Sequence, residues 1–449
     1  QDQNELSNLE HEMANIPFDI FDNNLDNFQL FKFKDNKGGF VLNTHHLIAD
    51  ACTAGIIASK IVNIYSSLIK NEPITEIPTS YINYINSENE YLNSNKFIKD
   101  KEYWEENFKS SFDLASLSTY NLDTSSHCNC DANRKVFVLK KRQVKAIENY
   151  CKKNNFSLFN FFMAIYALYI GKVRNLKHFV LGTPILNRTT FGEKHTPGMF
   201  ISTVPFYFNL EGNPTFKDFI TSITVQTIGM FRHQKYPYQE ILSYLRKQDS
   251  SIPNLYNIMI SYQNTKTEKD ASDIKYDVRW THSDFTSDEL DIHLFDMNNY
   301  GTLNIAYDYQ TAKYSLDDIT NIHNRILYII KQVLEASSSL ALNKINLVTP
   351  EEKYAILHKY NHDRYQRIDK TIIDLFLEQV KIAPNKTAIS DNGKSLTFSQ
   401  LDAVTDSFCA YFAENGLKPK DKICLFLNNS IELVISIISI LKYLKYNIN

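Results

Sequence analysis

The sequence predicts a mixed fold of the α/β or α+β class, and three observations favour this prediction. Short segments in which apolar and polar residues alternate recur along the chain, for example at 28–34 and 203–208, and this period is typical of half-buried strands. Longer segments, such as 316–336, repeat apolar residues at helical spacing. The two kinds of segment are intermixed along the chain, as in domains where helices pack on a sheet.

The first unit is expected to cover residues 1–125. Residues 1–20 form a mixed polar segment without a helix-capping signal. Strands at 28–34 and 40–44 flank the turn sequence Asp35–Gly39, which predicts a hairpin. A helix at 52–70 and a mostly helical stretch at 81–108 are expected to follow.

A stretch rich in Ser, Thr, Asn and Asp, at 116–134, has little periodicity and is the best internal boundary. A second unit, 126–345, is expected beyond it, with strands and helices intermixed. Its predicted strands are 136–139, 178–181, 203–208, 257–263, 290–295 and 303–309, and its predicted helices are 144–151, one capped by Ser157, 215–231, 238–246 and 316–336.

A linker at 346–368, around Pro350 and Asn361, is expected to lead to a third element at 369–449. Both ends of the chain look cut, because neither carries the elements that a closed domain needs. The predicted pieces of the third element are a helix at 371–381, a strand pair around Asn392–Gly393, a helix from Ser399, a strand at 423–427 and a helix at 431–441.

The composition is that of an ordinary globular protein, with 43% hydrophobic and 22% charged residues. A formal net charge of -3 gives no basic surplus, which argues against nucleic acid or an anionic membrane as a partner. Six cysteines in 449 residues do not form a disulfide framework. The apolar run 433–441 is too short to span a bilayer, and the given sequence does not begin with a charged-then-apolar signal, so a cytoplasmic location is expected.

The most informative stretch is the turn from His45 to Asp50, between a predicted strand and a predicted helix. Histidines at the carboxyl end of a strand lie where ligand pockets commonly open. An imidazole there can accept a proton from a nucleophile near pH 7. Asp50 could hold an imidazole, the loop or a distant cation, and a purely structural histidine pair explains the spacing as well.

Other candidate residues carry weaker signals. Arg188 follows a buried strand and could pair with Asp50, although an ordinary surface arginine fits equally. Gly198 precedes an apolar strand and suits a backbone that lines a narrow channel, or any turn. His233 is best explained as a helix-terminal histidine, with only slight support for a dyad with Glu240.

Cofactor and metal motifs are not evident in the sequence. His127, Cys128 and Cys130 could suggest a metal, but no second cluster supplies the remaining ligands and a polar loop fits better. Neither a Gly-rich phosphate loop, a GxSxG elbow nor an HExxH helix is found.

Read in order, six stretches resemble the condensation domain of nonribosomal peptide synthetases over roughly residues 15–345. Residues 45–51, HHLIADA, match the family signature HHxxxDG except at the last position. The other five stretches are similar to the family's Tyr/Asp/Tyr, Asn-Arg, GxFVNT and HQDxPFE elements and to its strand ending in Gln-Asn: 80–84, 183–188, 198–203, 233–240 and 253–264.

The tail resembles the beginning of an adenylation, or AMP-binding, domain of the same assembly lines. Residues 396–401, LTFSQL, are similar to its LTYxEL element, and 440–442 to the start of its LKAGxAYVP element. The resemblance implies that the ATP-binding residues of such a domain lie beyond 449, so this chain should not adenylate a substrate.

The resemblance implies two chloramphenicol-acetyltransferase-like lobes in a V, 1–125 and 126–345, with the active site in a tunnel between them. The first lobe is expected to be incomplete at its start. Carrier domains would deliver phosphopantetheine thioesters from opposite ends of the tunnel, so donor and acceptor carrier proteins and the adjacent adenylation domain are the expected partners. No cofactor or metal bound by this chain itself is expected.

The implied reaction is attack of an acceptor amine on a donor thioester, which forms a peptide bond. His46 is the expected catalytic residue, as a proton acceptor or as a positioning partner. His45, Asp50 and Arg188 are expected to support the site. The resemblance also suggests four residues near the tunnel: Ala51, Gly198, Ser202 and Gln263.

Two departures from the family pattern bear on activity. Ala51 stands where the family has Gly, which would restrict a left-handed backbone, and Ser202 stands where the family usually has Asn. Two alternatives to condensation stay open. One is an epimerisation domain, disfavoured by the lack of an EGHGRE-like stretch and by the adenylation start that follows. The other is a non-catalytic docking or scaffold module.

Overall fold

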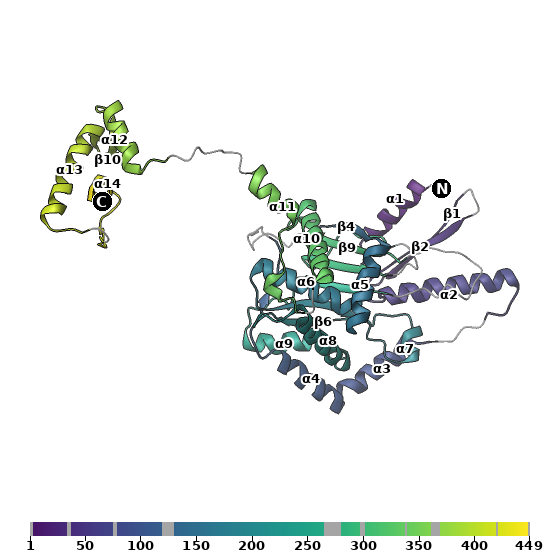
Figure 1. The fold of residues 1–449 in the computed structure, drawn as a ribbon. Coiled ribbons are helices and arrows are strands. Elements are labelled where there is room, and N and C mark those ends of the chain that lie inside the picture. Colours follow the sequence, from purple (N-terminus) through teal and green to yellow (C-terminus); the bar gives the residue numbers. More distant parts are fainter. Residues whose placement is uncertain are drawn as a thin grey trace. The chain divides into compact units, whose positions relative to one another are not determined.

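The computed structural model describes residues 3–33, 37–74, 79–118, 130–264, 280–296, 301–336, 339–360, 369–418 and 421–447 (Figure 1). These residues form two compact units, which comprise residues 1–353 and 354–449. The predicted mixture of strands and helices is confirmed in both units. The predicted boundaries near 125, 345 and 368 remain predictions.

The larger unit is organised around a seven-stranded mixed sheet. Its strands are β3 (Asp113–Leu114), β4 (Ala132–Leu139), β5 (His178–Ile185), β6 (Ser202–Asn209), β7 (Ile258–Gln263), β8 (Leu290–Phe295) and β9 (Leu303–Gln310). They lie in the order β3-β5-β7-β8-β9-β4, and β6 also pairs with β5. The β3·β5, β5·β7 and β7·β8 pairs are parallel, whereas β5·β6, β8·β9 and β9·β4 are antiparallel.

The core of the larger unit lies between this sheet and its helices. These are α5 (Lys141–Asn154), α6 (Leu158–Arg174), α7 (Phe191–His195), α8 (Phe216–Arg232), α9 (Tyr238–Gln248) and α10 (Leu316–Glu335). The α6 helix is buried along residues 160–171 and contacts α5, α8 and α10 (Figure 1). The hydrophobic run at 161–170 is typical of a helix that other elements cover on all sides.

The segment that carries the histidines combines a hairpin with three helices. The strands β1 (Asp26–Lys32) and β2 (Gly38–Thr44) pair in antiparallel fashion, which confirms the predicted hairpin. The helices α2 (Ala51–Lys70), α3 (Tyr81–Leu92) and α4 (Asn95–Asn107) follow. By length and composition α2 is long and apolar enough to cross a membrane. The helices α5 and α6 pass the same test only if they are taken as one span, and they are bent by 103° relative to each other. Core helices of soluble proteins also pass this test.

The first helix was not expected from the sequence. Residues Gln3–Ala14 form α1, although 1–20 look like a polar segment without a cap. Leu6 and Met13 are buried. Because they are seven residues apart, they lie on the same face of the helix. Tertiary packing of that face therefore outweighs the weak local signal.

The smaller unit contains α12 (Ile372–Ile382), the hairpin β10 (Thr387–Asp391) and β11 (Lys394–Thr397), α13 (Phe398–Glu414) and α14 (Ile431–Asn447). It is preceded by α11 (Pro350–Tyr354) and a π-helical turn at Ala355–Lys359, and a 3-10 turn lies at Leu342–Lys344. The prediction of a strand at 423–427 is wrong. The structure has no strand there, these residues pair with no other described segment, and Phe426 is 99% exposed. An apolar run without a partner strand cannot satisfy a strand's backbone hydrogen bonds.

Candidate functional site

The two histidines lie on a tight turn between β2 and α2. The backbone N–H of His45 donates to the Leu25 carbonyl at 2.8 Å, and the N–H of Ile48 donates to the His45 carbonyl at 3.1 Å. The turn ends at Asp50, whose carboxylate accepts the N–H of Thr53 at 2.7 Å and so caps the first turn of α2. A strand end, a closed turn and a capped helix therefore fix the backbone that carries His46.

The two imidazoles lie in different surroundings. His45 is half-buried, meets the Phe18 ring edge-on at 5.8 Å, and accepts the Leu47 N–H at its Nδ1 at 3.1 Å. His46 is exposed, and no hydrogen-bond partner for its ring is found in the described part of the chain. The structure therefore gives His45 a local bonding role and leaves the His46 ring open to an incoming group.

A buried ion pair ties this turn to a distant segment. The Nη2 of Arg188 lies 3.0 Å from Oδ1 and 3.1 Å from Oδ2 of Asp50. The side chains of Arg188 and Asp50 are only 2% and 0% exposed. Burying two charges is costly unless geometry and further hydrogen bonds compensate them, so the remaining partners of this pair matter.

Those remaining partners are mostly backbone groups. The Nη1 of Arg188 donates to the carbonyls of Glu193 and Thr196 at 2.5 and 2.6 Å, and Nη2 also reaches the Gly198 carbonyl at 3.1 Å. Asp50 accepts the N–H of Phe200 at 3.1 Å. The guanidinium also lies 3.9 Å from the centre of the Phe200 ring. The ion pair therefore holds 188–200 against the start of α2.

Gly198 lies at the closest approach between this segment and α3. Its φ of 153° is positive, and a Cβ there would lie 2.1 Å from the Tyr81 ring. Thr53 clamps the same residue, because its Oγ1 donates to the Gly198 carbonyl at 2.7 Å and accepts the Gly198 N–H at 3.0 Å. The Tyr81 hydroxyl donates to the Met199 carbonyl. A glycine is therefore required by contact as well as by conformation.

The structure brings some predicted site residues together and leaves others apart. Ala51, the first residue of α2, adjoins Asp50 and has no positive φ, so the concern about a left-handed backbone is unfounded. Ser202 begins β6, opposite Ile185 in the register. Gln263 ends β7, and its only described side-chain hydrogen bond reaches Ser261.

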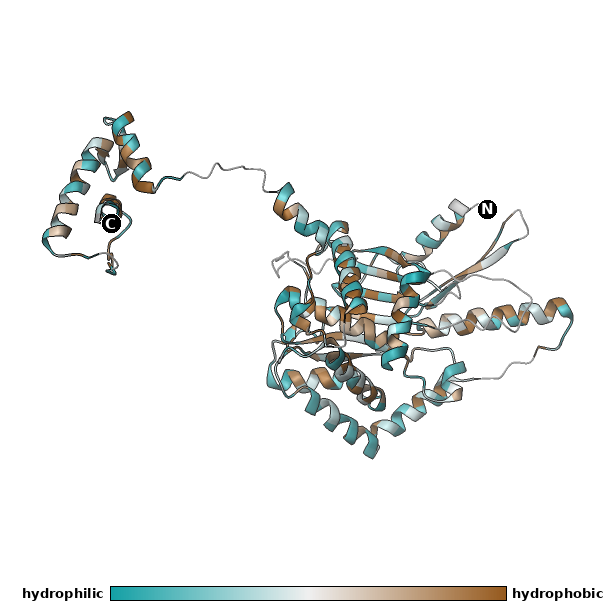
Figure 2. Ribbon diagram, in the orientation of Figure 1, coloured by the Kyte–Doolittle hydropathy of each residue, from teal (hydrophilic) through white to brown (hydrophobic). Residues whose placement is uncertain are grey.

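A cavity of about 430 Å³ adjoins the histidine turn. It is lined mainly by apolar side chains of the β1–β2 hairpin and α2, and Figure 2 shows apolar residues recurring along these elements. The lining residues are Asp26, Phe28, Leu42, Thr44, Ile48, Ala49, Thr53, Ile57, Ile61 and Pro197. Sequence reasoning missed this cavity, because its lining comes from several separate segments and only their packing brings these residues together.

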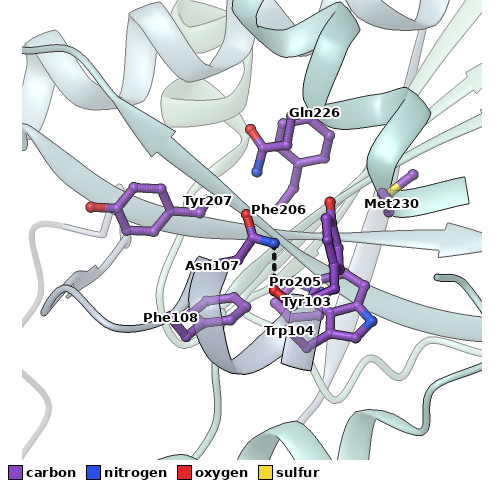
Figure 3. A pocket seen from close by; sticks show the side chains of 9 residues that line it. All are labelled: Tyr103, Trp104, Asn107, Phe108, Pro205, Phe206, Tyr207, Gln226 and Met230. Carbon is purple, nitrogen blue, oxygen red and sulfur yellow. Dashed lines mark hydrogen bonds between the residues drawn. The ribbon is translucent and has the colours of Figure 1, made fainter. Parts of the chain in front are cut away.

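A second, aromatic cluster packs α4 against β6 and α8. Figure 3 shows Tyr103, Trp104 and Phe108 beside Tyr207 and Met230, and the cluster leaves no volume for a water molecule. Trp104 donates from its indole N–H to the His233 carbonyl at 3.0 Å. The cluster is therefore packing and not a ligand site.

His233 is the C-cap residue of α8, as the sequence predicts for a helix-terminal histidine. Its ring stacks on Tyr103 at 4.0 Å, and its Nδ1 lies 2.6 Å from the Asp100 carboxylate. Its acidic partner is therefore Asp100 and not Glu240, which the sequence suggested weakly. Sequence reasoning missed this partner because Asp100 lies on α4, 133 residues away from His233 in the chain.

A metal centre was not expected from the sequence. Of the three residues that might have suggested one, His127 and Cys128 lie outside the described residues and only Cys130 is described. No group of three or more potential ligands comes together within the ranges that the structure describes.

Comparisons with known proteins match nearly the whole chain to the same kind of multidomain synthetase. The condensation domain profile matches residues 1–357, and the AMP-binding enzyme profile matches residues 376–443. A plipastatin synthase subunit of Bacillus subtilis is 26% identical over 98% of this chain, and surfactin synthase subunit 1 of the same organism is 28% identical over 97%. The chain spans only 17% and 12% of the length of these two relatives.

Solved structures show the same fold. A starter condensation domain of rhizomide synthetase, solved with C8-CoA, matches with a TM-score of 0.64, at 18% identity and 77% coverage of both chains. A four-domain nonribosomal peptide synthetase bound to AMP and glycine matches with a TM-score of 0.71, at 14% identity, over 98% of this chain and 34% of that one. The chain belongs to the condensation domain family of nonribosomal peptide synthetases, and a short AMP-binding segment follows that domain.

Proposed function

We propose that this protein forms peptide bonds between a donor aminoacyl or peptidyl thioester and an acceptor aminoacyl amine. The observation that carries the proposal is the exposed His46 ring on a turn that the buried Asp50–Arg188 pair fixes in place. Membership of the condensation domain family supports the same reaction.

His46 is the proposed catalytic residue. The acceptor nitrogen attacks the thioester carbon, the C–S bond breaks, and the amine proton moves by way of the His46 imidazole to the departing sulfur. General-base assistance of this kind typically contributes about a hundredfold to ten-thousandfold in rate. Alignment of two tethered substrates lowers the barrier further, because it replaces a bimolecular encounter.

Asp50 and Arg188 are proposed to position the histidine turn without touching substrate. Both side chains are almost fully buried, and their hydrogen bonds are directed to each other, to Thr53 and to backbone groups of 193–200. His45 supports the turn through its bond to Leu47. A shift in this clamp would move the His46 ring, and small misplacements of catalytic groups cost large factors in rate.

Both substrates are proposed to arrive as phosphopantetheine thioesters on donor and acceptor carrier proteins, so the chain itself needs no bound cofactor. The adjacent adenylation domain is the proposed third partner, in line with the AMP-binding segment at 376–443. Ala51, Gly198, Ser202 and Gln263 are proposed to line the path of the substrates.

A reconstitution assay tests this function. Donor- and acceptor-loaded carrier proteins are mixed with the protein, with its His46→Ala variant, and with His358→Ala, which removes an exposed histidine from the smaller unit. We expect the dipeptidyl thioester with the wild type and the His358 variant, and loss of product with His46→Ala.

Other outcomes of the same assay would contradict the proposal. A racemised donor without amide product would identify an epimerisation domain. Absence of any product with the wild type, or equal yields with and without His46, would favour a non-catalytic docking or scaffold role.

A further inference from the structure

A second group of reactive side chains lies on the large sheet, apart from the histidine turn. The Ser261 hydroxyl on β7 lies 2.7 Å from Nδ1 of His293 on β8. The opposite ring nitrogen, Nε2, lies 3.2 Å from Oδ2 of Asp308 on β9. Three neighbouring strands thus present a serine, a histidine and an aspartate in one hydrogen-bonded chain.

The strand register explains why these side chains meet. Ser261 and His293 are direct partners across β7 and β8, and Asp308 is paired with Asp291, two residues before His293. Side chains alternate between the faces of a strand. Ile260 and Ile292 point into the buried core, so Ser261 and His293 occupy the opposite face.

The charges around His293 favour an arrangement in which Ser261 donates a hydrogen bond to His293 and His293 donates one to Asp308. Arg134 binds Asp308 through Nε and Nη2, at 2.6 Å each. Burial would raise the pKa of Asp308, but hydrogen bonds from Arg134 and His293 outweigh it and keep the pKa well below the usual range. An ionised Asp308 accepts the Nε2–H of His293, which leaves Nδ1 as the acceptor for the Ser261 hydroxyl.

We propose that Ser261 is a nucleophile for acyl transfer, with His293 as its general base and Asp308 as the group that orients the base. A nucleophile and a base within hydrogen-bond reach, with the base held by a third group, is the arrangement that activates a serine on unrelated folds. The substrate class is acyl thioesters, a choice that rests on the proposed function.

The chemical step balances without a further reactant. The Ser261 oxygen forms a bond to the thioester carbon while its proton passes to Nδ1 of His293. The C–S bond breaks, and the departing sulfur takes that proton, which leaves an acyl ester on Ser261 and a free thiol.

Gln263 supplies a hydrogen-bond donor beside the nucleophile, since its Nε2 lies 3.4 Å from the Ser261 oxygen. An amide donor in this place can stabilise the negative charge that develops on the substrate oxygen. Ser261 itself is only 2% exposed, whereas His293 and Gln263 are half-buried. The acyl group would therefore reach the serine past these two side chains.

Acylation of the serine is measured directly. The protein is incubated with the acetyl thioester of N-acetylcysteamine, and separately with p-nitrophenyl acetate, then digested and mapped by mass spectrometry. We expect one acetyl group on Ser261 in the wild type and none at that position in Ser261→Ala. His293→Gln should slow labelling about a hundredfold or more, because it removes the base.

Two controls keep the result interpretable. Ser439→Ala removes a buried serine that donates only to a backbone carbonyl, and it should leave labelling of Ser261 unchanged. His46→Ala should also keep this labelling, so failure of amide formation and failure of this proposal are separate results. A wild-type protein without acetyl at Ser261, or labelling that is equally fast in His293→Gln, overturns the proposal.

Discussion

At the scale of single residues, the Asp50–Arg188 pair is the feature on which the histidine turn depends. Its two charges are buried, and one guanidinium serves a carboxylate, a hydroxyl and three backbone carbonyls. Lysine could not replace it, because an ammonium lacks the planar fork of donors. The pair fixes two segments that lie 138 residues apart in the sequence.

The costs of removing the two charges of this pair should not be additive. Arg188→Met leaves the Asp50 carboxylate buried without a cation, and we expect it to lower the free energy of unfolding by about 3–5 kcal/mol. Arg188→Met with Asp50→Asn should cost less than the sum of the single changes, by about 0.5–3 kcal/mol. Urea unfolding of the four proteins measures this coupling, and strictly additive costs would contradict it.

Gly198 should not tolerate a side chain. Gly198→Ala places a Cβ 2.1 Å from the Tyr81 ring, and we expect a cost of about 1–3 kcal/mol in the free energy of unfolding. Gly192→Ala is the matched control, because its Cβ would meet only the Thr190 hydroxyl, at 4.0 Å. Thermal melts compare the two, and equal melting temperatures would show that the contact does not constrain the fold.

At this scale the sequence predicts candidate residues for the site but not their geometry. The pattern of 45–51 made His46 and Asp50 candidates, and the predicted pairing of Arg188 with Asp50 is found in the structure. The Ser261–His293–Asp308 chain had no such signal, since its members are single polar residues on three different strands. Only the pairing register brings them together, and register depends on long-range packing.

At the scale of elements, α10 carries a buried histidine that should make stability depend on pH. The ring of His323 stacks on Phe137 at 3.9 Å, and its Nδ1 lies 3.2 Å from the Tyr307 hydroxyl. Burial lowers the pKa of His323 to about 4, from an ordinary value of 6.5. The neutral imidazole is therefore the form that the folded protein accepts.

The sign of the pH effect follows from this lowered pKa. Between pH 6.5 and 4 the unfolded chain binds a proton at His323 and the folded protein does not, so stability is complete above pH 6.5 and falls as the pH drops. The loss should reach about 3 kcal/mol near pH 4. Urea unfolding at several pH values should show a flatter profile for His323→Gln. An unchanged profile in that variant would contradict the assignment.

Most elements followed from local patterns, and the exceptions have physical causes. The helices at 316–335 and 216–232 and the β1–β2 hairpin agree with their predicted positions. The helix α1 was missed because its stability comes from burial of one face. The strand at 423–427 was wrong because an apolar run forms a strand only where a partner is available.

At the scale of the whole molecule, the chain contains two units with separate hydrophobic clusters. The cluster of the smaller unit is built on Leu401, Ile431 and Ile435, and a buried Lys442 pairs there with Asp402 and Asp406. The larger unit holds an extensive core around α6 and the seven-stranded sheet. Because each unit has its own hydrophobic core, we expect each to unfold cooperatively and independently of the other.

This division can be tested with the two tryptophans, since Trp104 and Trp280 both belong to the larger unit. Leu401→Ala creates a cavity in the smaller unit and should destabilise it by about 2–5 kcal/mol. We expect the circular dichroism transition of the smaller unit to move while the tryptophan fluorescence transition stays in place. A matching shift of both signals would show that the units unfold together.

The central claim is that His46 acts on the reacting amine while the buried ion pair only holds its turn. The most direct measurement is the single-turnover rate of amide formation by the wild type and by His46→Ala, with folding checked by circular dichroism. We predict a rate lower by about a hundredfold to ten-thousandfold in a variant that is as stable as the wild type. A rate for that variant within a few-fold of the wild type would contradict the claim.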